Sequence, residues 1–213
     1  MKNKITKIIW LFVIGSFIGY LIETAVVIYQ GNYEVRKRLI YGAFIPVYGL
    51  GAIVYYLVLS NIKLNKENKI KNIIIVFLIT LIVGGVTEYI CSYVQEMCFG
   101  TVSWDYSYLP FDIQGRTSLK HSTFWGLLGV TYYLLVMPWV EKADRIIDKK
   151  VTKVLTIMVS IFLIFDILIS ILACHRNYER RQNIEPSGKF EKFLDEHYPD
   201  EHLDKIYVNL REK

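Results

Sequence analysis

The chain has 213 residues, of which 53% are hydrophobic and only 21% are charged, and its formal net charge is +5. Soluble domains of this length carry closer to a quarter charged residues and distribute their apolar residues periodically, whereas here the apolar residues form long uninterrupted blocks. This composition excludes the disordered, collagenous and coiled-coil classes. Three cysteines, an odd number in a long chain, also exclude a disulfide-stapled secreted scaffold.

Five apolar stretches have about the length of a membrane span. A bilayer core of about 30 Å needs about 20 apolar residues as helix, and the stretches lie at 8–29, 43–60, 73–93, 121–140 and 151–173. The first is too long for the apolar region of a signal peptide and has no small-x-small cleavage site after it, so we interpret it as a retained anchor. We therefore predict an all-α polytopic membrane helical bundle of about five transmembrane helices over residues 1–174.

The basic residues indicate how the bundle is oriented. The amino terminus and the loops at 61–72 and 141–153 are rich in lysine, and cytoplasmic loops carry an excess of Lys and Arg. We expect these three segments on the inner side of the bacterial cytoplasmic membrane, with the amino terminus cytoplasmic. Five spans then place the carboxyl-terminal tail outside, but the tail carries a basic cluster, Arg176, Arg180 and Arg181, which argues against that side. A re-entrant segment in the third loop would place the tail on the opposite side. Because membrane orientation accounts for the excess of basic residues, we expect the protein to have the lipid bilayer as its partner and not to bind nucleic acid.

Residues 175–213 form the only stretch with soluble character, a short amphipathic tail punctuated by Pro186, Gly188 and Pro199. Apolar residues recur there at helical spacing, in two groups: Phe190, Phe193 and Leu194, then Leu203, Ile206, Tyr207 and Leu210. We predict two short helices that lie on the membrane surface or on the bundle. The alternative is a docking element for a partner.

Parts of the chain align with one another. An offset of 77 residues places Tyr48-Gly49-Leu50 on Trp125-Gly126-Leu127, and Tyr55-Tyr56 on Tyr132-Tyr133. An offset of 65 residues places Gly19-x-x-x-Glu23 on Gly84-x-x-x-Glu88. Together they suggest a parallel repeat of two-helix hairpins, unlike the inverted repeats of many transporters. The alternative is two hydrophobic hairpins that merely look alike.

Glu23 and Glu88 interrupt the first and third apolar blocks. An ionised carboxylate within a membrane costs at least a few kcal/mol unless it is paired or protonated, so each marks a candidate functional site. The nearest cations in sequence are residues 36–38 for Glu23 and Arg116 for Glu88. Two interpretations remain open: buried salt bridges that lock helix packing, or a polar, outward-opening cavity that binds an ion or polar substrate.

Other small or acidic residues in the spans are candidates for packing or for the same cavity. Gly15 and Gly19 form a G-x-x-x-G seam that continues to Glu23, and Gly84 is expected to serve the third span similarly. Glu96 follows Glu88 by two helical turns, so the two can line one groove but are too far apart to share a proton. Asp166 has no evident partner in sequence.

The sequence contains no recognisable catalytic or metal-binding motif. Neither H-E-x-x-H nor Cys-x-x-Cys is present, and there is no glycine-rich phosphate loop or nucleophile elbow. We therefore expect no metal, no cofactor and no enzymatic activity. An intramembrane enzyme acting on lipid or polyprenyl substrates is the minor alternative.

The third loop carries the motifs that are most specific. The sequence runs E-Y-x-x-S-x-x-x-E from Glu88 to Glu96, then Trp104-Asp105-Tyr106-Ser107, Gly115-Arg116 and Trp125-Gly126. With Glu23 and Gly15-Ser16, these elements resemble the bacterial CmpB-like family of type IV ABC-transporter permeases over residues 10–140. Where that family has N-R-G-F-L-x-G-P, this chain has R-K-R-L-I-Y-G-A at 36–43, so that Lys37 preserves only the charge.

The resemblance implies a small multi-pass permease component with a shared polar and aromatic core. Trp104 and Tyr106 suit the membrane interface, and Asp105 is expected to hold Arg116 in place. We expect a homo-oligomer or partner membrane subunits, with a separate ATPase subunit. The alternative function is a non-transporting interaction or sensor protein with structural charges. The expected site residues are Glu23, Glu88, Glu96, Asp105 and Arg116, supported by Lys37, Trp104, Tyr106 and Trp125.

Overall fold

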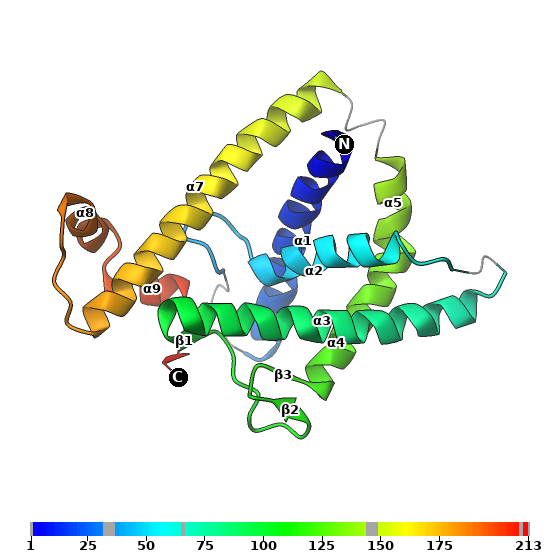
Figure 1. The fold of residues 1–213 in the computed structure, drawn as a ribbon, viewed down its shortest axis with the longest axis horizontal. Helices are drawn as coiled ribbons and strands as arrows, with labels where there is room; N and C mark the ends of the chain where they lie inside the picture. The colour runs from blue at the N-terminus through cyan, green and yellow to red at the C-terminus, as the bar shows by residue number, and fades with distance from the viewer. Residues whose placement is uncertain (1, 32–36, 65–66, 144–148, 209–210, 213) are drawn as a thin grey trace.

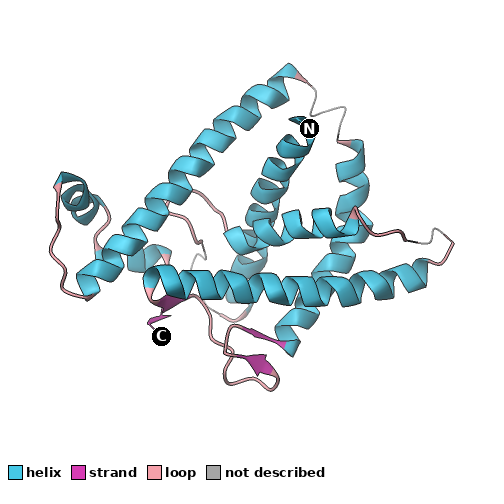
Figure 2. Cartoon of the chain, viewed as in Figure 1, coloured by secondary structure: helices cyan, strands magenta, loops and turns pink. Residues whose placement is uncertain are grey.

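A computed structural model describes residues 2–31, 37–64, 67–143, 149–208 and 211–212. The chain is an all-α bundle, as predicted (Figure 1, Figure 2). Within the described residues, four helices are long and apolar enough to cross a membrane. They are α1 (Lys2–Tyr29), α3 (Lys69–Phe99), the continuous helix made of α4 (Leu119–Thr131), π-helical η1 (Tyr132–Val136) and α5 (Met137–Lys142), and α7 (Lys150–Arg181).

The second predicted span is a shorter helix, α2 (Pro46–Leu59). Its 14 residues rise about 21 Å, less than a bilayer core. α2 begins late because Pro46 occupies its first turn, where the missing N–H is not needed. The residues before it, 37–45, are not helical, yet Leu39, Ile40 and Ile45 are buried. In the described part of the chain, four helices of spanning length and the shorter α2 therefore stand where about five spans were predicted.

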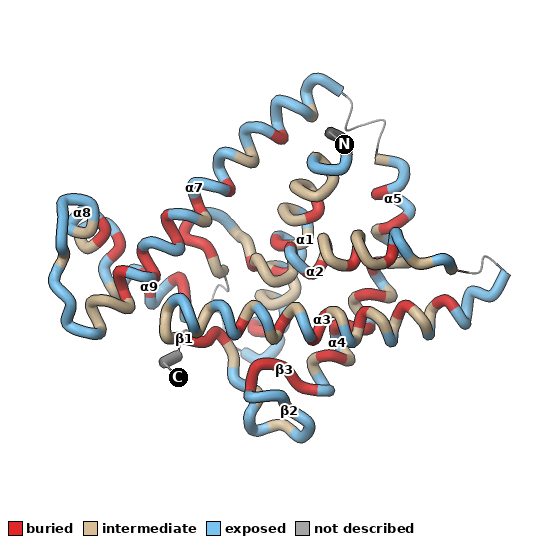
Figure 3. The backbone as a smooth tube through the Cα atoms, in the orientation of Figure 1, coloured by how far each residue is buried: buried red, intermediate tan, exposed pale blue. Residues whose placement is uncertain are grey.

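α3 shows why such helices pack in a membrane. The residues facing its neighbours recur every fourth position and are mostly small or polar: Asn72, Val76, Thr80, Gly84, Glu88 and Ser92. The exposed face has the same period and is apolar, with Ile74, Leu78, Ile82, Val86 and Ile90 (Figure 3). Apolar side chains can face lipid, whereas small residues let helices approach closely.

The two hairpins pack through the same pairs of positions. Gly19 of α1 lies against Tyr48 of α2, and Gly84 of α3 lies against Trp125 of α4. Gly49 contacts Phe12, and its counterpart Gly126 contacts Phe77. Each pair maps onto the other by the offsets of 65 and 77 residues seen in the sequence. A side chain at Gly19 or Gly84 would overlap the facing aromatic residue, which explains why both helices carry glycine there.

The matching aromatic residues also contact each other across the bundle. The rings of Tyr48 and Trp125 have centroids 5.3 Å apart, and those of Tyr55 and Tyr132 are 5.8 Å apart. Contact between equivalent positions is what a two-fold axis generates. Aligned positions of the hairpins α1–α2 and α3–α4 thus meet at the Tyr48–Trp125 and Tyr55–Tyr132 contacts.

The tail packs on the bundle and closes one end of it. α8 (Lys189–His197) and α9 (Asp200–Ile206) bury Leu194, Leu203, Ile206 and Tyr207 against α7. β4 (Arg211–Glu212) pairs with β1 (Thr101–Val102), so the tail and the third loop share one end of the bundle, which we call the tail end. Part of each apolar stripe therefore packs on the bundle, which is the first of the two predicted roles, whereas Phe190 and Phe193 are exposed and Leu210 lies outside the described residues. The boundary expected at residue 174 falls inside α7.

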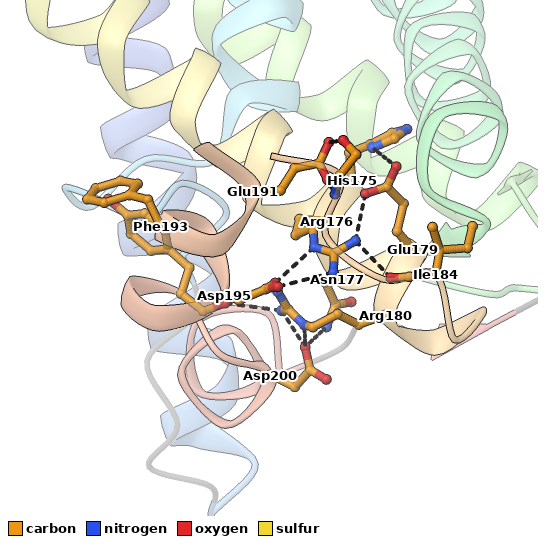
Figure 4. A network of polar contacts seen from close by, with 12 residues as sticks. His175, Arg176, Asn177, Glu179, Arg180, Ile184, Glu191, Phe193, Asp195 and Asp200 are labelled. Atoms are coloured by element: carbon orange, nitrogen blue, oxygen red, sulfur yellow. Dashed lines mark hydrogen bonds and ion pairs between the residues drawn. The ribbon is translucent and has the colours of Figure 1, made fainter. Parts of the chain in front are cut away.

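A buried arginine fastens the tail to α7 (Figure 4). Arg176 donates two hydrogen bonds to the Asp195 carboxylate, at 2.9 and 3.1 Å, and one to the backbone oxygen of Ile184. Arg180 binds Asp195 at 2.6 Å and also pairs with Asp200. Arg176 and Arg180, two members of the arginine cluster that argued against an outer tail, are thus paired with acidic residues within that tail.

Candidate functional site

A cavity of about 800 Å³ lies at the tail end, between α1, the start of α2, α4 and the third loop. Its polar lining comes from residues far apart in sequence: Glu23, Gln30, Arg38, Tyr48, Glu88, Ser103, Trp104, Tyr106, Tyr108, Lys120, His121, Trp125 and Thr131. Its apolar lining comes from α1, α2 and α4: Ile22, Val26, Val27, Val47, Phe124, Leu127 and Leu128. Of the predicted site residues, Glu23, Glu88, Trp104, Tyr106 and Trp125 line this one cavity.

Glu88 is held from the third loop. Its carboxylate is buried and accepts a hydrogen bond from Thr117 Oγ1 at 2.8 Å and one from Tyr106 at 3.2 Å. Thr117 belongs to β3 (Thr117–Ser118), which pairs with β2 (Asp112–Ile113) in a short hairpin. The hairpin returns the chain to the bundle so that the Thr117 hydroxyl faces α3. The third loop therefore closes over the carboxylate.

Tyr106 connects this carboxylate to α4. Its ring stacks on His121, with centroids 3.6 Å apart and planes 7° from parallel. Burial, and then the neighbouring Glu88, raise the pKa of the Tyr106 hydroxyl above its ordinary value, so that it remains a donor. His121 is itself oriented by a 2.8 Å hydrogen bond between its Nδ1 and Ser118 Oγ. His121 belongs to no metal-binding motif, so its place in the cavity could not be predicted from the sequence.

Glu23 lies in the equivalent position of the first hairpin. It is half-buried, lines the cavity, and lies close to the Tyr48 hydroxyl, just as Glu88 lies close to Trp125. Tyr48 is within electrostatic reach of both carboxylates. Among the cations expected near Glu23, Arg38 lines the cavity and Arg36 is outside the described residues. The repeat thus brings two carboxylates from separate hairpins to one space.

The expected pairing of Arg116 with Glu88 was wrong. Arg116 is buried and pairs with Glu96, its Nη2 lying 2.6 Å from Oε2. The guanidinium also stacks near the rings of Tyr89 and Tyr93, at 5.7 and 5.2 Å from their centroids. Glu96 sits two turns beyond Glu88, where the returning loop reaches α3, and it does not line the cavity. The Arg116–Glu96 pair fastens the third loop and leaves Glu88 to the hydroxyl donors.

Trp104 and Asp105 shape the third loop around that pair. Trp104 Nε1 donates to the backbone oxygen of Arg116 at 2.8 Å, a contact that the sequence did not predict. Asp105 was expected to hold the Arg116 side chain, but its carboxylate accepts from the Ser107 amide at 2.9 Å. It lies over Gly115, whose φ of 68° and missing side chain make room for it.

Lys37 and Asp166 organise the first loop outside the cavity. The Lys37 ammonium donates to the Ile40 carbonyl at 3.0 Å. Asp166 accepts from the Tyr41 amide at 2.9 Å, and Ser170 Oγ accepts from the Ile40 amide at 3.0 Å. A non-helical segment buried in a bundle needs acceptors for its amides, and α7 supplies them. This explains the lone aspartate in the last span.

The described residues contain no cluster of three His, Cys, Asp or Glu side chains that could hold a metal ion. What the cavity offers is a set of fixed charges, hydroxyl groups and aromatic rings. These can bind and orient a charged molecule by ion pairing, hydrogen bonding and cation–π contact.

The fold defines the class of protein. A bundle with apolar side chains outside, small and polar side chains between its helices, and four helices of spanning length is a polytopic helical membrane protein. The chain belongs to the family described as "Putative ABC-transporter type IV", whose profile matches residues 10–171. Searches of curated proteins and of solved structures gave no significant match. The family match covers the spans and the third loop and ends within α7.

Proposed function

We propose that this protein is a transport component of the bacterial cytoplasmic membrane, and that a charged substrate binds in the cavity at the tail end. The observation that carries the proposal is that Glu23 and Glu88, equivalent residues of the two hairpins, line the same cavity. Carboxylates are costly within a membrane unless they serve a pathway or a partner. Salt bridges for packing are provided elsewhere, by Arg116 with Glu96 and by the arginines of the tail.

The parallel repeat supports this proposal. Binding sites of transporters commonly lie where two structural repeats meet, because movement of one repeat against the other changes access. Here the repeats meet at the Tyr48–Trp125 contact, and both residues line the cavity. With the amino terminus cytoplasmic, the tail end and its cavity face outward.

The protein is small for a complete pathway, so we propose that it works as a homo-oligomer or with partner membrane subunits. The family name supports an ABC-type system, in which a separate ATPase subunit would supply the energy. No enzymatic reaction or cofactor is part of the proposal.

The test is a ligand-stability screen on the purified full-length protein in detergent. Soluble cations, zwitterions and amphiphiles are added to the wild type, Glu88→Gln, Glu23→Gln and the exposed control Glu196→Gln. We expect at least one compound to raise the melting temperature of the wild type and the control, with at least a tenfold weaker effect in the two cavity variants. A response that is equal in all four proteins would refute the cavity as the binding site.

A further inference from the structure

The cavity shares part of its wall with the lipid-facing surface. Val26 of α1 and Phe124 and Leu127 of α4 line it, yet their exposed fractions are 49%, 51% and 53%. In a membrane these side chains meet acyl chains, because exposed apolar faces of spanning helices contact lipid. One side of the cavity is therefore continuous with the hydrocarbon of the bilayer.

The charged groups of the cavity lie at two depths. Lys120 is the second residue of α4 and lies at the membrane boundary, whereas Arg38 belongs to the segment that folds back into the bundle before α2, where its amide donates to the Phe44 carbonyl. Glu23 and Glu88 lie within α1 and α3, roughly 9 and 16 Å from the ends of these helices at 1.5 Å per residue. Cations and carboxylates in one cavity, with Lys120 at its rim, are complementary to a dipolar molecule whose positive end lies at the carboxylates.

The aromatic lining suits the same positive end. Tyr48 and Trp125 lie next to the two carboxylates, and a cation over such rings gains attraction beyond its ion pair. A free anion would meet the carboxylates unfavourably, and an ion without an apolar part would leave the Val26, Phe124 and Leu127 side unused.

We propose that the cavity binds the headgroup of a zwitterionic phospholipid that carries an ammonium group. The ammonium lies between Glu23 and Glu88, the phosphate lies at Arg38 and Lys120, and the acyl chains leave along Val26 and Leu127 into the bilayer. This inference rests on the proposed function and specifies its substrate class. The same headgroup chemistry also occurs in free phosphoethanolamine, which has no acyl chains.

The experiment measures thermal stabilisation of the full-length protein in a neutral detergent by three probes: dioctanoyl phosphatidylethanolamine, dioctanoyl phosphatidylglycerol and phosphoethanolamine. We expect phosphatidylethanolamine to act at the lowest concentration, because it alone has both an ammonium group and acyl chains. Glu23→Gln and Glu88→Gln should each raise the concentration it requires by about tenfold or more, as expected for loss of a charge-assisted hydrogen bond. The exposed Glu196→Gln should respond like the wild type.

A variant at the rim keeps the test valid if Glu88→Gln fails to fold. Lys120 is exposed at the start of α4, and Lys120→Gln should weaken phosphatidylethanolamine and phosphatidylglycerol alike, since both carry the phosphate. Equal stabilisation by phosphatidylglycerol and phosphatidylethanolamine in the wild type would overturn the ammonium site. Equal potency of phosphoethanolamine would overturn the role of the bilayer opening.

Two further results separate this inference from the proposed function. If no lipid probe acts but a soluble compound gives stabilisation that depends on Glu23 and Glu88, the lipid inference fails and the transport cavity stands. If nothing gives a glutamate-dependent response, both fail.

Discussion

Arg176 is the side chain whose removal should most clearly separate the tail from the bundle. It is only 2% exposed and donates hydrogen bonds to Asp195, Glu179 and the Ile184 carbonyl. Removing one partner of a buried ion pair costs about 3–5 kcal/mol. The lower end applies here, because the Asp195 side chain is 25% exposed and keeps Arg180. We expect Arg176→Ala to cost about 3 kcal/mol of tail docking, or an increase of about 100-fold in the open fraction.

Hydrogen exchange measured by mass spectrometry in detergent tests this prediction. The amides of α8 and α9 should exchange about 100-fold faster in Arg176→Ala, while those of α1 and α3 keep their wild-type rates. Lys192→Ala is the matched control, since it removes the same charge from an exposed position of α8. If both variants exchange alike in the tail, the Arg176 network does not hold the tail in place.

Two further predictions concern pH and the hairpin seam. Burial opposes ionisation of Asp195 and Asp200, but the arginine hydrogen bonds outweigh it and lower the pKa of both carboxyls. The contribution of these two carboxylates to tail docking is therefore complete above the ordinary aspartate pKa of about 4 and is lost as the pH falls through their lowered pKa values. Hydrogen exchange of the α8 and α9 amides, measured from pH 6 to 3, should reveal this loss. Gly84→Val would force a branched side chain into Trp125 and should destabilise the bundle by about 2–3 kcal/mol. The control Gly188→Val places the same side chain in open space and should change the melting temperature little. Equal melting temperatures of the two variants would contradict close packing between Gly84 and Trp125.

The sequence was sufficient for features that follow from membrane physics and local spacing. Long apolar blocks predicted the helices, and the rarity of intramembrane carboxylates identified Glu23 and Glu88. The glycines at 19 and 84 were expected to pack, and each faces an aromatic residue. These features depend on the composition and spacing of residues within a single helix, or on the requirement that small residues line helix contacts. A single sequence was therefore enough to predict them.

The features that were missed depend on the paths of loops. Helical spacing places Glu96 near Glu88 but contains no information on where Arg116 returns after a loop of about twenty residues. The same holds for Asp166, which binds an amide more than a hundred residues away. The short α2 was obscured because residues 43–45 are apolar and at least partly buried without being helical. Such pairings require the three-dimensional course of the chain.

The repeat places two carboxylates alike, but the third loop makes their surroundings differ. Glu88 is buried and receives Thr117 and Tyr106 from that loop, whereas Glu23 remains half-buried on the cavity wall. A ligand entering the cavity would therefore reach Glu23 without displacing the loop, but could contact Glu88 fully only by competing with its two hydroxyl donors. Substitution of Glu23 should accordingly weaken first capture, and substitution of Glu88 should also loosen the third loop, so that faster hydrogen exchange at 104–118 is expected in Glu88→Gln alone.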